Sequence, residues 1–274
     1  DEAGNWSTEA SLEVSNIDKD VPDAPTLQAD KTAPTNTDVT VTITYSADSV
    51  VKQYKIGSGN WTNYTGPVVL SSNNTVYAKG QDEAGNWSTE ASLEVSNIDK
   101  VAPNAPTLQA DKTGPTNTDV TVTITYSADS VVKQYKIGSG NWTNYTGPVA
   151  LSENATVYAK GQDEAGNWSA EASLVVNNID KVAPIITIGE YNTEPTNQDI
   201  TVTASVNEGT LNAESHTFTE NGSFEFIATD AAGNESRKTV TITNIDKVAP
   251  VITIEPYNTE PTNQDITVTA SVNE

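Results

Sequence analysis

The sequence predicts an all-β chain made of small antiparallel β-sandwiches in tandem, and three observations lead to this prediction. The segment Asp-Glu-Ala-Gly-Asn-Trp-Ser starts at Asp1, Asp82 and Asp163, which gives an internal repeat of 81 residues. Apolar and polar residues alternate with a period of two in short segments. No segment shows the 3.6-residue period of an amphipathic helix.

The clearest strand signal lies in residues 38–45. Val39, Val41, Ile43 and Tyr45 alternate there with threonines. An apolar residue at every second position puts one face of a strand on a core and leaves the other face wet. The segment therefore predicts a half-buried strand with a threonine-rich outer face.

The other strands follow from the same alternation and from turn residues. Gly57–Asn60 reads as the Gly-rich turn of a hairpin. About seven short strands in each repeat, with turn signals at regular spacing, predict a two-sheet sandwich of the immunoglobulin type. Strands are expected at 24–30, 51–56, 61–64, 67–70, 75–81 and 91–96 of the first full repeat, and at 199–206 of the third.

The repeats define the domain organisation. Residues 20–100 and 101–181 align without gaps and differ at ten positions, whereas a third repeat, 182–247, is shorter. Residues 1–19 match the last strand of a repeat, and residues 248–274 match the start of another short one. We therefore expect the chain to be a window from a longer tandem array.

A second motif marks the joints between repeats. Each joint has the form Asn-Ile-Asp-Lys followed by a proline three residues after the lysine. Joints this short, with proline and without a Gly/Ser-rich linker, predict semi-rigid connections. The motif starts at Asn16, Asn97, Asn178 and Asn244.

Composition excludes several classes of function. The net charge is −23, from 14 basic and 37 acidic residues, which argues against nucleic acid and anionic lipid as partners. There is no cysteine, so disulfides, thiolate nucleophiles and Cys-ligated zinc are excluded. One histidine leaves almost no material for triad chemistry. No apolar stretch is long enough for a membrane span.

The residues also carry a family resemblance. Segments 54–67 and 75–88, combined with the Asn-Ile-Asp-Lys-x-x-Pro joint, resemble bacterial Ig-like (Big) repeats. Segments 216–224 and 228–234 are similar to a second variety of the same group. The resemblance implies an immunoglobulin-like fold in surface adhesins, S-layer-associated proteins or the non-catalytic stalks of secreted enzymes. It also implies an extracellular location.

Calcium is the first candidate ligand, because carboxylate and amide oxygens recur at the joints and in the Asp-x-Ala-Gly-Asn turn. The alternative is that Asp82 and Asn86 cap their own turn, with Gly85 at positive φ, and that the joint aspartates form turns before proline. The candidate ligands are Asp82, Asn86, Asp99, Asp163, Asn167, Asp180, Asp230, Asn234 and Asp246, with Asp18 as a further joint aspartate.

Carbohydrate is the second candidate ligand, because exposed aromatic rings stack on sugars. The alternative is that one tryptophan of a repeat covers the end of the core and the other packs beside a strand, since the chain has only three phenylalanines. The third repeat lacks both tryptophan positions, so a sugar site would be confined to the longer repeats. The tryptophans concerned are Trp6, Trp61, Trp87, Trp142 and Trp168.

Catalysis is not expected. The repeats are too small for a substrate cleft, and His216 has no counterpart in the other repeats. The sequence thus predicts non-catalytic stalk or fibre repeats of a bacterial surface or secreted protein, in contact with neighbouring repeats or with other copies. The alternative is a glycan- or protein-binding accessory module of a secreted enzyme or an S-layer-associated protein.

Overall fold

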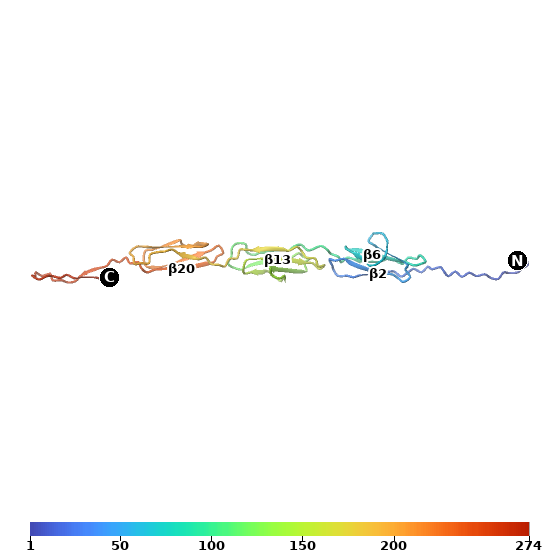
Figure 1. The fold of residues 1–274 in the computed structure, drawn as a ribbon, viewed down its shortest axis with the longest axis horizontal. Helices are drawn as coiled ribbons and strands as arrows, with labels where there is room; N and C mark the ends of the chain where they lie inside the picture. The colour runs from blue at the N-terminus through green and yellow to red at the C-terminus, as the bar shows by residue number, and fades with distance from the viewer. Residues whose placement is uncertain (274) are drawn as a thin grey trace. The chain divides into compact units, whose positions relative to one another are not determined.

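The chain is all-β. The computed structural model describes residues 1–273, whose regular elements are all strands joined by turns (Figure 1). Residues 1–273 hold no helix with the length and apolar character needed to cross a membrane. The absence of a helical period in the sequence is thereby explained, and the prediction of an all-β fold is confirmed.

Contacts within the chain group it into two compact units. The first unit contains the first full repeat and most of the second, and the second unit contains the third repeat and the remaining segments of the second. The first unit is Asp1–Gln109, Val122–Val149 and Thr156–Val175; the second is Ala110–Thr121, Ala150–Ala155 and Val176–Glu274.

The first full repeat is a sandwich of two antiparallel sheets. One has the order β1-β2-β5 and the other the order β4-β3-β6-β7. Figure 1 shows β2 and β6 in the two layers. The strands are β1 (Thr26–Ala29), β2 (Val39–Thr44), β3 (Val51–Ile56), β4 (Thr62–Asn63), β5 (Val68–Leu70), β6 (Asn74–Gln81) and β7 (Ala91–Val95).

The second repeat has the same strands in the same order. Its sheets are β12-β9-β8 and β11-β10-β13-β14. The strands are β8 (Thr107–Ala110), β9 (Val120–Thr125), β10 (Val132–Ile137), β11 (Thr143–Asn144), β12 (Val149–Leu151), β13 (Ala155–Gln162) and β14 (Ala172–Val176).

The third repeat uses two three-stranded sheets, β15-β16-β18 and β17-β19-β20, and a separate hairpin, β21-β22, follows it. The second sheet of the third repeat has one strand fewer than the four-stranded sheet of the longer repeats, because a short turn after β17 replaces the β3–β4 hairpin. The strands are β15 (Ile186–Ile188), β16 (Ile200–Val206), β17 (Thr210–Leu211), β18 (Ser215–Phe218), β19 (Gly222–Thr229), β20 (Glu235–Ile242), β21 (Ile252–Ile254) and β22 (Ala270–Val272).

The core of the first repeat lies where the alternation predicts it. Val39 and Val41 on β2 are fully buried, and Ile43 is 4% exposed. They pack with residues of β5, β6 and β7, including Leu70 and Val76. Since Thr40 and Thr42 point the other way, β2 has one dry and one wet face.

The two sheets are also joined by tyrosines. Tyr45 continues the apolar face of β2, and its hydroxyl donates to the carbonyl of Gln53 on the other sheet at 2.9 Å. Tyr64 accepts a hydrogen bond from the backbone N–H of Ile43 at 3.2 Å. Burial raises the pKa of Tyr45 well above its ordinary value. These tyrosines supply the large buried surfaces that a valine-rich core lacks.

Sequence variation between the two longer repeats avoids this core. The positions at which residues 20–100 differ from 101–181 are all exposed in the first repeat, among them Ala33, Val69 and Glu94. Substitutions there leave buried apolar area unchanged. The two repeats therefore share one core and differ only in their solvent-facing surface.

The turn between β16 and β17 of the third repeat requires a glycine. Gly209 has φ of +77°, and an added Cβ would overlap the Thr229 carbonyl oxygen and lie 2.7 Å from the Asp230 Cα. We expect Gly209→Ala to lower the free energy of unfolding by about 1–3 kcal/mol through strain.

The matched control is Gly222→Ala on β19, where an added Cβ meets no atom within 4 Å. We expect this variant to match or exceed the wild-type melting temperature, since alanine reduces the freedom of the unfolded chain. Thermal unfolding of both variants checks the prediction, and equal losses would contradict it.

Candidate functional site

The Asp-x-Ala-Gly-Asn turn is closed by its own side chains. In the second repeat, Asp163 Oδ1 accepts the Asn167 backbone N–H at 2.8 Å, and Asp163 Oδ2 accepts the Asn167 Nδ2 amide at 2.9 Å. The backbone N–H of Asp163 donates to the Asn167 carbonyl at 3.1 Å. This pairing fixes both ends of the turn, as expected when an Asp caps its own loop.

The same closure occurs in the other copies. Asp82 with Asn86 and Asp230 with Asn234 form the equivalent side-chain bonds. The glycine of each turn has a positive φ, as the sequence predicts: 96° at Gly85 and Gly166 and 89° at Gly233. Asp1 and Asn5 also pair at 3.0 Å.

The Asn-Ile-Asp-Lys motif ties together the two ends of its own repeat. The Asn97 amide donates to the carbonyl of Ala33 at 2.7 Å. Ile98 is buried and forms a parallel bridge with Thr35. This bridge consists of two 2.9 Å backbone bonds, from Thr35 N–H to Asn97 O and from Asp99 N–H to Thr35 O.

The last two residues of the motif complete this closure. Asp99 Oδ1 accepts the backbone N–H of Val101 at 2.9 Å, which forms a turn before the proline. Lys100 pairs with Asp38 at the start of β2 with an Nζ–Oδ1 distance of 2.8 Å. Equivalent ion pairs are Lys181–Asp119 and Lys247–Asp199, and equivalent turns form at Asp180 and Asp246.

Within the first unit, the turn of one repeat meets the motif of the repeat before it. Asn167 Nδ2 donates to the Asp99 carbonyl at 3.0 Å, and Asn36 N–H donates to the Ala165 carbonyl at 3.0 Å. The second unit forms the same contacts from Asn234 to Asp180 and from Asn117 to Ala232. Asn36 and Asn117 were not predicted from the sequence, because they donate through the backbone.

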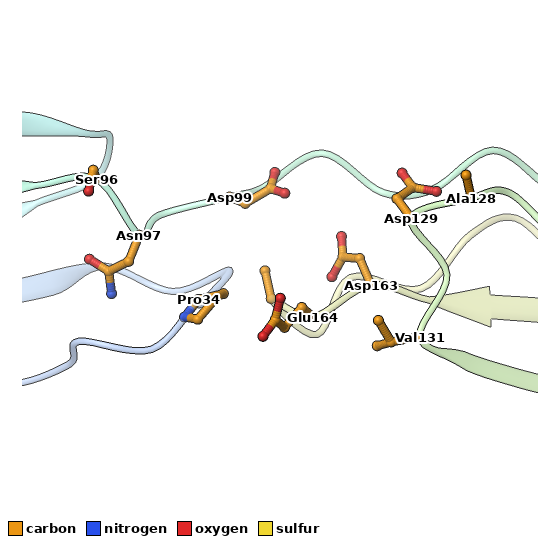
Figure 2. A pocket seen from close by; sticks show the side chains of 10 residues that line it. Pro34, Ser96, Asn97, Asp99, Ala128, Asp129, Val131, Asp163 and Glu164 are labelled. Carbon is orange, nitrogen blue, oxygen red and sulfur yellow. The ribbon is translucent and has the colours of Figure 1, made fainter.

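An acidic hollow of about 430 Å³ lies at this contact in the first unit (Figure 2). It is lined by Asp99, Asp129, Asp163 and Glu164 together with Pro34 and Val131. A similar hollow in the second unit is lined by Asp180, Glu208 and Asp230. Asp129, Glu164 and Glu208 were not among the residues predicted from the sequence, although Asp129 recurs as Asp48 in the 81-residue repeat.

The predicted calcium ligands already accept hydrogen bonds from the protein in the described part of the chain. Both carboxylate oxygens of Asp163 accept hydrogen bonds, and Asp99 caps a backbone N–H. No three acidic or histidine side chains of residues 1–273 are grouped so that they could hold a metal ion. Calcium takes six to eight oxygens, and the acidic side chains do not supply a group of them by themselves. Calcium binding stays a prediction without support from the geometry.

The same hydrogen bonds act on the acidity of the turn aspartates. The Asn86 side chain and backbone N–H groups lower the pKa of Asp82 below its ordinary value of 3.8, and Asp230 behaves alike. At Asp163 burial opposes this change, but hydrogen bonds from Asn167 and the turn N–H groups outweigh it and lower the pKa. The ionised carboxylate is therefore part of the folded turn.

The tryptophans do not enter the core but form a ladder with lysines on the outer face of the four-stranded sheet. In the first repeat Lys55 Nζ lies 4.7 Å from the ring centres of Tyr77 and Trp61. Lys79 Nζ lies 4.4 Å from Trp61 and 4.2 Å from Trp87. We call these five residues the lysine–aromatic ladder. The second repeat repeats it with Tyr158, Lys136, Trp142, Lys160 and Trp168.

The remaining sequence candidates lie apart from these features. Trp6 is 97% exposed in the N-terminal segment. His216 on β18 stacks on Phe224 with ring centres 3.9 Å apart and meets Phe218 edge-on. His216 is thus a half-buried packing residue of the third repeat.

Comparison with protein-family models and with curated proteins finds no match. Among solved structures, the chain is similar to the fibronectin(III)-like modules of CbhA from Clostridium thermocellum. The identity is 10%, the match covers 57% of this chain and 95% of that chain, and the TM-score is 0.30. It is also similar to a tetra-tandem repeat in the extending region of a large adhesion protein. The identity is 17%, the coverage is 91% and 87%, and the TM-score is 0.24. These likenesses concern the fold alone.

Because the candidate ligands are already engaged in turns, we expect calcium to leave the stability of the chain unchanged. The melting temperature of the full chain should agree in excess calcium and in excess chelator, with magnesium at equal ionic strength as the control. A calcium-specific rise in melting temperature would reinstate the metal interpretation of Asp99 and Asp163.

The turn aspartates predict a loss of stability in acid. A carboxylate whose pKa is lowered by folding stabilises the folded state above its unfolded pKa, and this contribution is lost as the pH falls through the lowered value. We therefore expect the triple variant Asp82→Asn, Asp163→Asn and Asp230→Asn to melt below wild type at neutral pH. The gap should close as the pH falls below about 4.

The matched control carries Glu9→Gln, Glu13→Gln and Glu83→Gln, which remove the same charge from exposed positions. Melting temperatures measured from neutral pH to about pH 2 compare the three proteins. A gap of constant size at every pH would show that the turn carboxylates act through shape and not through charge.

Proposed function

We propose that the chain is a load-bearing spacer: non-catalytic, immunoglobulin-like repeats of the Big type that carry tension along a bacterial protein outside the cell. One observation carries the proposal. The Asn-Ile-Asp-Lys motif closes its own repeat through Asn97 and Ile98, and the carbonyl of its aspartate, Asp99, accepts the amide of the next repeat.

The geometry of the closure suits tension. Thr35 lies near the start of the repeat and Ile98 near its end, and their backbones run parallel. A pull on the two ends of the repeat then moves these segments in opposite directions along their length. The bonds from Thr35 to Asn97 and from Asp99 to Thr35 are loaded together, so they resist as a group.

The contact between repeats adds to this resistance and limits bending. Each contact combines a backbone bond with a side-chain bond, and the proline after each motif is buried at Pro103 and Pro184. Repeats of roughly 30–40 Å, estimated from the strand rise, would project a terminal domain away from a surface. The charge of −23 keeps neighbouring molecules apart.

Stretching single molecules of the full chain tests the proposal. We expect one unfolding event for each complete repeat, and a lower unfolding force in the variant Asn97→Ala, Asn178→Ala and Asn244→Ala. Each substitution removes two hydrogen bonds to the loop before β2, β9 or β16. The free energy of unfolding should fall by about 1–3 kcal/mol per repeat.

The control variant is Asn60→Ala with Asn141→Ala, at exposed positions of the hairpin turns. It should keep the wild-type unfolding force. If the motif variant also keeps the wild-type force while its melting temperature drops, the motif supports folding but bears no load, and the proposal fails.

A further inference from the structure

The lysine–aromatic ladder holds a cation without an anionic partner. Lys79 lies between the rings of Trp61 and Trp87, and within residues 1–273 its Nζ has no carboxylate within 4.0 Å and no hydrogen-bond acceptor. Lys160 is in the same position in the second repeat. Among the described residues, Lys52 and Lys133 also lack an ion pair, but each lies over a single tyrosine ring, at 5.9 and 6.0 Å. Lys79 and Lys160 differ from them because each ammonium lies 4.2–4.4 Å from the centres of two indole rings.

The surroundings of this ammonium suit an anion that also has an apolar face. An ammonium has three N–H donors, and a carboxylate is their strongest acceptor. Trp87 ends the ladder, is 36% exposed and contacts one lysine, whereas Trp61 contacts two. The Gln53 amide, directly opposite Lys79 on β3, adds a polar group on the same face.

We propose that this face of the first and second repeats binds an acidic polysaccharide whose sugars carry carboxylates. The net charge of −23 repels such a polymer at long range, so the binding depends on local contacts with the ladder and should strengthen as salt screens the repulsion. The carboxylate pairs with Lys79 or Lys160, and the C–H face of the sugar lies against the indole of Trp87 or Trp168. A sugar acid has an apolar C–H face for the indole and a carboxylate for the ammonium. An aspartate or glutamate side chain has only the carboxylate. The site occurs in two repeats of the chain, and a polymer with a carboxylate on every sugar can supply a ligand to each of them.

The chain contains its own comparison for this site. On β7, Glu94 lies on the same face as Tyr77, diagonally across the pair, and its counterpart in the second repeat is Val175. Lys55 also pairs with Glu90 at 3.7 Å in the first repeat. Glu90 recurs as Glu171 in the second repeat, so Glu94 is the acid that distinguishes the two sites. Glu94 opposes an anion in the first repeat, and we therefore expect the site of the second repeat to bind more tightly.

The third repeat replaces the ladder with acids. Counted from its turn at Asp230, Glu225 stands at the position of Tyr77 and Glu235 at that of Trp87. Arg237 bridges them, with nitrogen–oxygen distances of 2.8 and 3.2 Å. This face has lost both indoles and carries two carboxylates, so the full chain has two sites and not three.

Titration calorimetry on the full chain with oligogalacturonate tests the proposal, with the fully methyl-esterified oligomer as the probe that lacks the carboxylates. We expect two sites for the acid form and none for the ester. The variant Lys79→Gln with Lys160→Gln should weaken binding about tenfold or more, as expected for loss of a charge-assisted bond. Lys160→Gln alone should cost more than Lys79→Gln alone.

The control variant is Lys19→Gln with Lys238→Gln, which makes the same change in charge at exposed lysines outside the ladder. It should bind like wild type. Absence of binding by the acid form, equal binding by the ester, or equal weakening in the control variant would each overturn the proposal. Equal affinity for polyglutamate would overturn the assignment to carbohydrate. The comparison of the acid and the ester uses the wild-type chain, so it tests the proposal even if a variant fails to fold.

Discussion

The hydrogen-bonded pair of aspartate and asparagine in the turn is the contact on which the tandem architecture depends. When Asp163 accepts the backbone N–H and the amide of Asn167, the asparagine is held in one orientation. The same amide nitrogen then donates to Asp99 of the preceding repeat. A side chain that was free to rotate would lose conformational entropy on forming that bond. The Asn167 side chain is already held by the turn, so forming the bond to Asp99 costs little further entropy.

Hydrogen bonding to backbone and amide N–H groups is also sufficient to explain why acidic residues gather at the joints. An ionised aspartate is a strong acceptor for N–H groups, and a lowered pKa at Asp82, Asp163 and Asp230 is the signature of that use. The joint aspartates serve the same purpose for the backbone after them, as Asp99 does for Val101. Repeated carboxylates at a domain joint are thus compatible with turn formation alone.

The sequence predicted most of the fold, because the fold is encoded in local patterns. The alternation in 38–45 predicted β2 and its buried face, and the Gly-rich segment after Ile56 predicted the hairpin of β3 and β4. Gly85 was expected at positive φ from the composition of its turn. Each of these depends on residues that are close in the sequence, and period and turn chemistry report on those directly.

The site was less predictable because it depends on contacts between residues far apart in the chain. Asn167 and Asp99 are separated by 68 residues, and Asn36 takes part through its backbone, which has no signature in the sequence. The tryptophans were seen, but their stacking on Lys79 and Lys160 was not. That stacking requires the register that places Lys79 opposite Gln53 and beside Tyr77, which only the paired strands define.

The third repeat shows that the joint and the outer sheet face are independent features of these sandwiches. Its turn and motif make the same bonds as the longer repeats, through Asn234, Asp180 and Asn244. Its outer sheet face, in contrast, exchanges the ladder for an ion-pair network around Arg237. Exposed ion pairs contribute little to stability, and cation–π contacts contribute somewhat more, so neither network decides whether the sandwich folds. The joint is therefore constrained by its neighbours, while the face is free to differ. The ladder is present in two repeats and absent from the third. Binding of a ligand to this face explains that difference better than a contribution of the ladder to the stability of the sandwich.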